Sequence, residues 1–431
     1  RYTLRLLTLD QLSRAAALIC ALELERDRDR AKLGEWPFEI GLWVGRAATP
    51  NRMGKRGYKG PAPDSTAYMV TRRFKMSSKN NRAPLPIENC PWCGTKFGAD
   101  SFRLVPSEIQ PINLVVHCEN LKCDFHGDRA LPLVSVDEPI YHRLPGFIIA
   151  TVDKFASLPW TAETGALFGN VDRYDKTGFY GAASDKSGTA LPKGSLLPPD
   201  LIIQDELHLI SGPLGTIAGV YETAIDALST REVDGQRIRP KIIASTATVR
   251  RAEQQIRALF DRTQVVIFPP PGPDRRDSFF ARTETASADS PARLYLGIAA
   301  QGRSLKVVFL RAGLALLSAA QTAYKREGGK KSDNPADPYM TLLGYFNSLR
   351  ELGGSVLIVA DEVHTRLQTY GTRKRLDPPE QLLSDRNIDY EVLELTSRVP
   401  TNEVASVKRR LSLPFSDAEH VDVALATNMI S

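Results

Sequence analysis

The chain has 431 residues, of which 42% are hydrophobic and 25% are charged, as in a globular protein with two or three domains. No uninterrupted apolar run approaches the roughly 20 residues that span a bilayer, so we expect a cytoplasmic protein without a membrane segment. The net charge of +6 is compatible with a polyanionic partner but does not establish one. Because the chain starts at Arg1 without a methionine, we expect it to be a piece of a longer protein.

The first residues combine a strand-like start with a helical pattern. RYTLRLLTLDQ (1–11) is followed by Leu12, Ala16 and Ile19 at helical spacing, which predicts a helix that ends near Gly34. FEIGLWVG (38–45) predicts a strand. The next residues, 46–87, are rich in glycine, proline, asparagine and basic side chains, which predicts a long and partly disordered surface loop.

Four of the five cysteines are clustered, in the pattern CxxC followed after 24 residues by CxxxxC. The pattern resembles a zinc ribbon, in which four thiolates bind Zn²⁺ at about 2.3 Å. The alternative of four unconnected reduced thiols explains the paired clustering less well. His117 and His126 are near enough to replace one cysteine, but we favour a structural Cys₄ site within an insertion at 84–130. The predicted zinc ligands are Cys90, Cys93, Cys118 and Cys123.

Two buried-strand patterns in the middle of the chain each end in polar residues. LIIQ (201–204) leads into DELH, and KIIA (241–244) leads into STAT. With helices expected at 216–230 and 249–261, this is the β-α-β-α alternation of a mostly parallel sheet. We expect the segment before them, 169–194, to be a loop.

Acids at the carboxyl end of a parallel strand lie where open α/β sheets bind ligands. Asp205 is placed to hold Mg²⁺ through its water shell, and Glu206 to orient or deprotonate an attacking water. Ser245, Thr246 and Thr248 are short donors and acceptors that can bridge to the first strand. Taken alone, DELH also fits a solvated acidic turn, and STAT a simple helix cap.

ATVDKF (150–155) follows a third buried strand, FIIAT. Thr151 and Lys154 can present a hydroxyl, backbone N–H groups and a charge to a phosphate. The alternative is a simple cap for the next helix, and we weigh it above a phosphate contact for this motif alone. Arg5 and Gln11 are weaker candidates for contacts with a nucleic-acid backbone.

The proline-rich FPPPGPDRRDSFF (268–280) marks the best domain boundary. Beyond it we expect a strand at 293–301, a helix at 305–324 and a helix at 339–352 that ends at Gly353-Gly354. Three further strands are predicted, at 355–361, 389–397 and 421–428. The second half therefore repeats the α/β alternation of the first.

The order of these motifs resembles that of superfamily 2 DExH helicases, and the phrases DELHLISGPLG and GYFNSLRELGG resemble the helicases of DISARM phage-defence systems. The resemblance covers nearly the whole chain. It implies an α/β fold with two RecA-like lobes, at 1–267 and 291–431. A proline-rich linker at 268–290 would join them, and the zinc-ribbon-like insertion would belong to the first lobe.

The resemblance also implies roles for single residues. Asp205, Glu206 and His208 would be catalytic, with ATP and Mg²⁺ as cofactors, and Ser245, Thr246 and Thr248 would couple hydrolysis to movement. Implied partners are DNA with a single-stranded region, a second defence-system subunit and an associated DNA methyltransferase. The implied nucleic-acid contacts are Arg5, Gln11, Thr151, Lys154, Thr396, Ser397, Arg398, Thr427 and Asn428.

The chain departs from the family pattern in two places. It holds no GxxxxGK[ST] phosphate loop, which these helicases carry one strand before the equivalent of RYTLRLLTLDQ, and no arginine-finger motif. We expect both to lie outside residues 1–431, so this chain alone should hydrolyse ATP negligibly. Robust turnover by residues 1–431 alone would contradict that expectation. Two alternatives stay open: a non-catalytic nucleic-acid-binding scaffold with a helicase-like body, and an RNA helicase.

Overall fold

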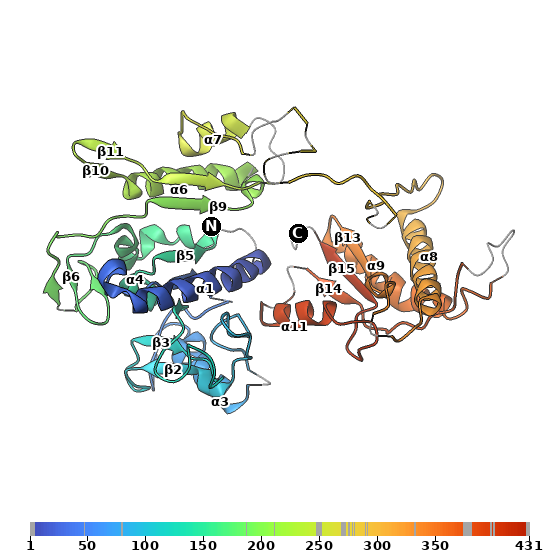
Figure 1. Cartoon of the computed structure of the whole chain (residues 1–431), viewed down its shortest axis with the longest axis horizontal. Helices are drawn as coiled ribbons and strands as arrows, with labels where there is room; N and C mark the ends of the chain where they lie inside the picture. Colours follow the sequence, from blue (N-terminus) through green and yellow to red (C-terminus); the bar gives the residue numbers. More distant parts are fainter. Residues whose placement is uncertain are drawn as a thin grey trace. The chain divides into compact units, whose positions relative to one another are not determined.

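The computed structural model shows a mixed α/β fold with two compact units, Arg1–Pro270 and Pro271–Ser431 (Figure 1). Each unit is described by itself. The structure describes residues 5–46, 48–78, 81–186, 188–210, 212–246, 252–268, 273–274, 276–277, 279, 281–288, 290, 292–331, 333–373, 382–396, 399 and 401–427.

Unit 1 holds seven helices and twelve short strands among these residues. The helices are α1 (Arg5–Arg28), α2 (Arg30–Leu33), α3 (Ala67–Met76), α4 (Asp137–Arg143), α5 (Val152–Phe155), α6 (Gly212–Ser229) and α7 (Ala252–Phe260). The strands are β1 (Ile40–Trp43), β2 (Phe102–Val105), β3 (Asn113–Val116), β4 (Leu133–Val134), β5 (Phe147–Ala150), β6 (Arg173–Tyr174), β7 (Phe179–Tyr180), β8 (Thr189–Ala190), β9 (Leu201–Gln204), β10 (Arg231–Val233), β11 (Gln236–Ile238) and β12 (Lys241–Ala244).

Two parallel sheets organise unit 1. One has the order β4-β1-β5, with Trp43 opposite Ala150 at its carboxyl edge. The other pairs β12 with β9 in parallel, so that Ala244 lies opposite Gln204. The strands predicted at FEIGLWVG, FIIAT, LIIQ and KIIA are therefore confirmed. Antiparallel pairs β2–β3 and β10–β11 and the small sheet β7-β6-β8 complete the unit.

The main core of unit 1 joins helix α1 to the cysteine segment. The predicted helical stripe is buried, because Leu12, Ala16, Ile19 and Cys20 all face this core. Cys90, Cys118 and Cys123 belong to the same cluster, together with aromatic residues such as Phe102 and Phe125. The cysteine segment therefore packs directly against α1 instead of standing apart from the body.

Several expectations for unit 1 are wrong. The described part of RYTLRLLTLDQ is helical from Arg5 onward, and the expected loop 46–87 contains α3, whose amino end is capped by Thr66. The expected loop 169–194 contains β6, β7 and β8. Strand β9 is also not buried on both faces, because Ile202 and Gln204 are covered while Leu201 and Ile203 are exposed.

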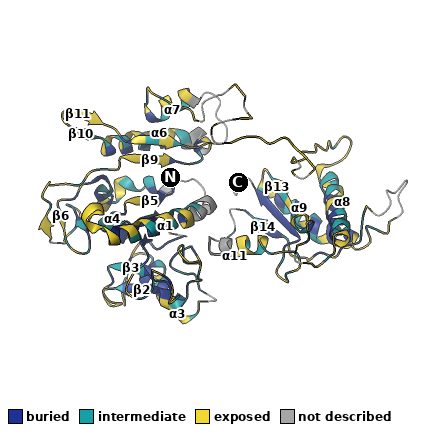
Figure 2. Ribbon diagram, viewed as in Figure 1, coloured by how far each residue is buried: buried dark blue, intermediate teal, exposed yellow. Residues whose placement is uncertain are grey.

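Unit 2 is built around the parallel sheet β13-β15-β14, in which β15 is buried along its whole length (Figure 2). Its helical segments pack leucine and valine side chains against this sheet. The elements are α8 (Leu305–Arg326), β13 (Leu342–Phe346), α9 (Leu349–Leu357), a π-helical stretch (Ile358–Val363), α10 (His364–Leu367), β14 (Leu393–Leu395), α11 (Thr401–Leu411) and β15 (Val423–Thr427).

The helix expected at 339–352 and the strand expected at 355–361 are exchanged in the structure. LLGYF forms β13, which pairs with β15, and SVLIVAD lies in the helical run that starts at α9. Ser348 caps the start of this run, and Gly353-Gly354 lie inside it instead of ending it. The buried positions Leu352, Val359, Val363 and Leu367 recur at helical spacing, and this period prevails over the β-forming composition.

Two further segments of unit 2 differ from expectation. The residues 293–300 form no strand, and Leu294, Tyr295 and Leu296 are exposed. Helix α8 is long and apolar enough to cross a membrane by length and composition alone, although it contains no uninterrupted apolar run of that length. Leu310, Leu314 and Leu317 on this helix are buried in the core of unit 2, which accounts for its apolar composition.

Candidate functional site

The DELH segment directly follows strand β9, and its two acids are half-buried. The carboxylate of Asp205 accepts a hydrogen bond from the backbone N–H of Glu206 at 3.0 Å. Oε2 of Glu206 lies 3.2 Å from Nδ1 of His208, which is itself exposed. The three predicted catalytic side chains are therefore brought together at the carboxyl end of β9.

The STAT segment lies against DELH, as the parallel pairing of β9 and β12 requires. The hydroxyl of Ser245 donates a hydrogen bond to Oδ1 of Asp205. Two backbone bonds close the same junction: the N–H of Leu207 donates to the Ser245 carbonyl and the N–H of Ser245 to the Gln204 carbonyl, both at 2.9 Å. Thr246 is exposed beside this contact, and Thr248 lies outside the described residues.

Glu206 adopts a backbone conformation that is rare for its residue type. Its φ of 49° and ψ of 48° are left-handed, and such a conformation costs a non-glycine residue about 1–3 kcal/mol. The turn directs the chain from β9 into the short helical turn Leu207–Leu209. Leu207 and Ile210 anchor this turn in a small core with Ala218 of α6 and Phe260 of α7. The packed turn therefore holds the Glu206 side chain in place at a cost in backbone energy.

A small cavity of about 10 Å³ lies beneath the DELH turn, with room for about one water molecule. It joins the end of β9 to helix α5, which follows β5 directly. The carboxyl ends of β5 and β9 are therefore neighbours, although the two strands are not hydrogen-bonded to each other. The cavity is lined by Val152, Phe155, Gln204, Ile210, Ala218, Tyr221 and Glu222.

The predicted phosphate contact Lys154 is buried and forms an ion pair with Asp137 of α4. Burial raises the pKa of Asp137 to about 6, although the ammonium of Lys154 acts to lower it. Tyr141 contacts this carboxylate and accepts a hydrogen bond from Trp43 Nε1 at 3.0 Å. The network ties β1, α4 and α5 together, and nothing in the sequence around Lys154 identified Asp137 as its partner.

Breaking this ion pair should destabilise unit 1. We expect Asp137→Asn to cost about 3–5 kcal/mol of unfolding free energy, because it leaves the Lys154 ammonium buried without its counter-charge. The double variant Asp137→Leu/Lys154→Met should recover most of that loss, since it removes both charges. Urea unfolding followed by circular dichroism measures both variants. Equal stability of Asp137→Asn and wild type would show that the pair does not hold these elements together.

The other predicted nucleic-acid contacts lie at strand ends or outside the described part. Thr151 follows β5, Thr396 follows β14 and Thr427 ends β15, and all three side chains are buried. Gln11 lies on α1 and is half-buried. The contacts of these residues with nucleic acid stay predictions. For Thr151, Thr396 and Thr427, such contacts would require the buried side chains to become exposed. The side chain of Arg5, and residues Ser397, Arg398 and Asn428, lie outside the described part of the chain.

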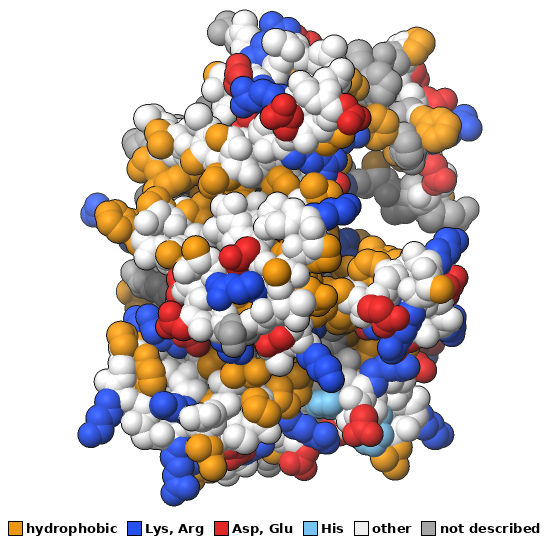
Figure 3. All heavy atoms as spheres, turned by 90° about the vertical axis from the view of Figure 1, so that its left-hand side faces the viewer, with side chains coloured by type: hydrophobic (Ala, Val, Ile, Leu, Met, Phe, Trp, Pro, Cys, Tyr) orange, Lys and Arg blue, Asp and Glu red, His pale blue; other side chains and the backbone are white. Residues whose placement is uncertain are grey.

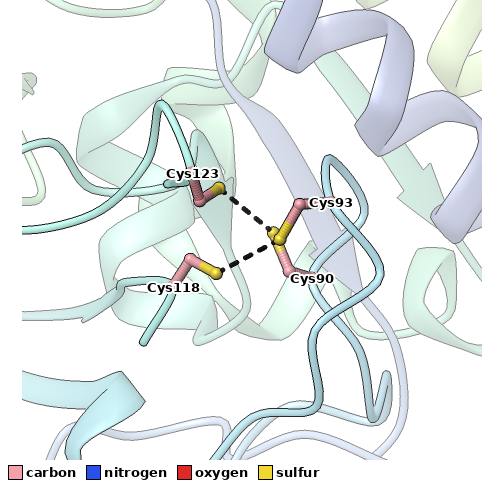
Figure 4. Close-up of side chains that lie close together, drawn as sticks. All are labelled: Cys90, Cys93, Cys118 and Cys123. Carbon is pink, nitrogen blue, oxygen red and sulfur yellow. Dashed lines mark hydrogen bonds between the residues drawn. The ribbon is translucent and has the colours of Figure 1, made fainter. Parts of the chain in front are cut away.

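The four clustered cysteines converge on one point (Figure 4), and their sulfur atoms all lie within 4.8 Å of one another. Sγ of Cys93 is 3.4 Å from Sγ of Cys118, and Sγ of Cys90 is 4.0 Å from Sγ of Cys123. Tetrahedral Zn–S bonds of about 2.3 Å place sulfurs about 3.8 Å apart, so the donor set fits a metal ion of this kind. Nδ1 of His126 faces the Cys118 carbonyl at 2.9 Å instead of joining the cluster.

The four thiols have unequal environments. Burial raises the pKa of Cys90 to about 12 and raises that of Cys123 further. Burial also acts to raise the pKa of Cys93, but hydrogen bonds with Thr95 and with neighbouring thiols lower it to about 6. The cluster therefore combines a thiol of lowered pKa, Cys93, with two thiols of raised pKa, Cys90 and Cys123. A bound cation would replace the thiol protons, as is usual when thiolates bind metal.

No family model matches the chain. The chain is 40% identical over its whole length to the DISARM protein DrmA of Bacillus paralicheniformis. The aligned region covers 37% of that protein, so the chain spans little more than a third of the relative's length. The aligned region spans the DELH and STAT segments, the four clustered cysteines and both compact units. Throughout its length, then, the chain is similar to one part of a DISARM protein.

Proposed function

We propose that this chain forms most of an ATP-dependent DNA helicase or translocase core that serves a bacterial anti-phage defence system of the DISARM kind. One observation carries the proposal: the hydroxyl of Ser245 bonds the carboxylate of Asp205 across the parallel pair β9–β12. An acidic DExH turn and a hydroxyl-rich turn on the neighbouring strand are the arrangement that resembles superfamily 2 helicases. The similarity to DrmA supports the defence role.

The DELH residues suit the chemistry of ATP hydrolysis. Asp205 and Glu206 offer the carboxylate oxygens that Mg²⁺ prefers, and both are accessible enough to receive a hydrated ion. Bound Mg²⁺ would neutralise charge on the triphosphate. Glu206 would orient and deprotonate the attacking water, while His208 holds its carboxylate from the other side. Ser245 would keep Asp205 in its orientation through the bond described above.

The wider architecture supports two RecA-like lobes. Polar residues stand at the ends of parallel strands in both units. In unit 1, Thr151 follows β5 in one sheet, and Asp205 and Ser245 follow β9 and β12 in the other; in unit 2, Thr396 follows β14 and Thr427 ends β15. The cysteine cluster would be a zinc ribbon with a structural role in the first lobe. By the DrmA resemblance, partners would be a DrmB-like subunit and an associated DNA methyltransferase.

The test is ATP hydrolysis by the intact protein that carries this chain. We expect single-stranded DNA to stimulate hydrolysis more than RNA of the same length. No hydrolysis with either nucleic acid, together with retained binding, would favour the alternative of a non-catalytic scaffold. Stimulation by RNA alone would favour the RNA helicase.

Ser245→Ala tests the contact that carries the proposal. The variant removes a hydrogen bond to a charged group, which is worth about 1.5–3 kcal/mol, so DNA-stimulated turnover should fall about 10- to 100-fold. Thr223→Ala is the control, because Thr223 is an exposed hydroxyl residue on α6 whose side chain bonds the Gly219 carbonyl of its own helix. Equal turnover in the two variants would mean that the Asp205–Ser245 bond has no role in hydrolysis.

A further inference from the structure

The loop after strand β1 carries a concentrated positive charge. Between Glu39 and Asp64 the chain has five lysine or arginine residues and no acidic one. All five side chains are exposed. We name residues 46–59 the basic loop; its cations are Arg46, Arg52, Lys55, Arg56 and Lys59.

The basic loop is anchored in the body of unit 1 on its inner side. Met53 is buried, and its backbone N–H donates a 2.7 Å hydrogen bond to the Glu138 carboxylate of α4. The carbonyls of Arg52 and Met53 accept hydrogen bonds from Ala67 and Tyr68, at the start of α3, at 2.9 Å each. The loop is therefore held between two helices, and its cations have a defined place on the surface.

Glycines set the shape of the loop tip. A turn closes where the N–H of Tyr58 donates to the Lys55 carbonyl at 3.0 Å, and Gly57 within it has a φ of 76°. Gly60 lies under the Tyr58 side chain, where a Cβ atom would be 2.2 Å from the phenol oxygen. Lys55 and Arg56 lie in this turn and Lys59 directly follows it, and all three residues are exposed.

Most of these cations have no acidic partner among the described residues. Arg52 forms an ion pair with Glu138 at 3.9 Å. Across the described ranges, Arg46, Lys55, Arg56 and Lys59 make no ion pair. By contrast, the face that carries β6 and the β10–β11 hairpin shows lysine and arginine interspersed with aspartate and glutamate (Figure 3). A cluster of one sign without counter-charges attracts a polyanion, whereas a mixed surface does not.

The basic loop begins close to the carboxyl end of β1, where the neighbouring strand β5 also ends. It follows Trp43, the last residue of β1, which lies opposite Ala150 at the end of β5. Helix α5 follows β5 directly and lines the cavity under the DELH turn. The basic loop thus leaves its sheet at the end where Thr151 lies, and the cavity joins that end to the carboxyl end of β9, which the acidic turn follows.

We propose that the basic loop is a phosphate-backbone contact for the nucleic acid on which this protein acts. The inference rests on the proposed function and adds to it a surface that the strand-end motifs do not include. Lys55, Arg56 and Lys59 contribute charge without base-specific geometry, so the contact is independent of sequence and sensitive to salt.

The experiment compares three forms of the full chain for binding a fluorescent single-stranded DNA 30-mer, by anisotropy at several salt concentrations. The first is wild type, and the second replaces Lys55, Arg56 and Lys59 with alanine. The third form is a matched control that replaces three exposed lysines elsewhere in unit 1 with alanine: Lys176→Ala, Lys193→Ala and Lys241→Ala. None of the three makes an ion pair with a described residue. Lys241 lies at the amino end of β12, at the opposite end of the strand from Ser245. Thermal melting of all three forms checks that each is folded.

We expect the basic-loop variant to bind about tenfold or more weakly near 100 mM salt, with the same melting temperature as wild type. The slope of log K against log salt should become shallower by about 2, because single-stranded contacts contribute about 0.7 each. The control should bind as wild type does. Unchanged affinity and slope in the basic-loop variant would overturn the inference, leave the proposed function standing and favour an acidic protein as the loop's partner. Failure of wild type to bind DNA or RNA would overturn both.

Discussion

Replacing Cys90 and Cys93 with serine is expected to remove one equivalent of zinc from the protein and to unfold residues 88–128. A structural zinc site contributes on the order of 10 kcal/mol to local folding, which is comparable to the whole stability of an ordinary domain. The loss of folding stability should extend beyond the cysteine segment, because Cys90 shares a hydrophobic core with Leu12 and Ala16 of α1. Metal analysis of the purified protein and thermal melting measure the two effects.

Cys20→Ala is the control for this experiment. Cys20 is buried in the same core but lies outside the cluster of four, and burial raises the pKa of its thiol to about 12. The control should keep one equivalent of zinc and lose no more than about 1–2 kcal/mol of stability, as expected for deletion of a small buried side chain. A double serine variant that melts with wild type, or a wild type that folds without metal, would contradict the assignment.

The parts of the site that the sequence predicted depend on local pattern. LIIQ and KIIA are short apolar runs between breaks, and parallel pairing of two such strands brings the ends that follow them together. That rule alone places Ser245 beside Asp205, as found. The cysteine spacing likewise predicted a cluster, because each knuckle fixes two thiols locally and a single cation can hold both knuckles.

The parts that were missed depend on long-range packing. Lys154 looked like an exposed charge at a strand end, but its partner Asp137 lies 17 residues away on another element, and only the folded chain brings them together. The exchange of helix and strand around Gly353-Gly354 has a related cause. SVLIVAD has strand-like composition, yet its valines share a helical period with Leu352 and Leu367, and the core of unit 2 selects that period.

The basic loop shows a third limit of sequence patterns. Its glycine- and proline-rich composition predicted a partly disordered segment, because such residues bury little apolar surface. Met53 instead anchors the loop to the body of unit 1, because it is buried and its backbone N–H bonds the Glu138 carboxylate. Composition describes the average of a segment and does not reveal such single contacts.

In the proposed function Glu206 carries out the chemical step, and the substitution of glutamine for this one glutamate tests that role. Glu206→Gln keeps the side chain's size and its hydrogen bonding near His208, and it removes the carboxylate that would accept a proton from water. General-base catalysis contributes about 10²–10⁴-fold, so turnover should fall by a factor in that range. The fold and DNA affinity should be unchanged, since the residue is half-exposed and its substitution conserves size.

The most direct measurement is therefore the turnover number for ATP of the intact protein carrying this chain, with saturating single-stranded DNA, for wild type and Glu206→Gln. We expect DNA-stimulated hydrolysis in the wild type and a loss of about 10²-fold or more in the variant, with DNA affinity within about threefold. Turnover in the variant within tenfold of the wild type, or no hydrolysis by the wild type at all, would contradict it.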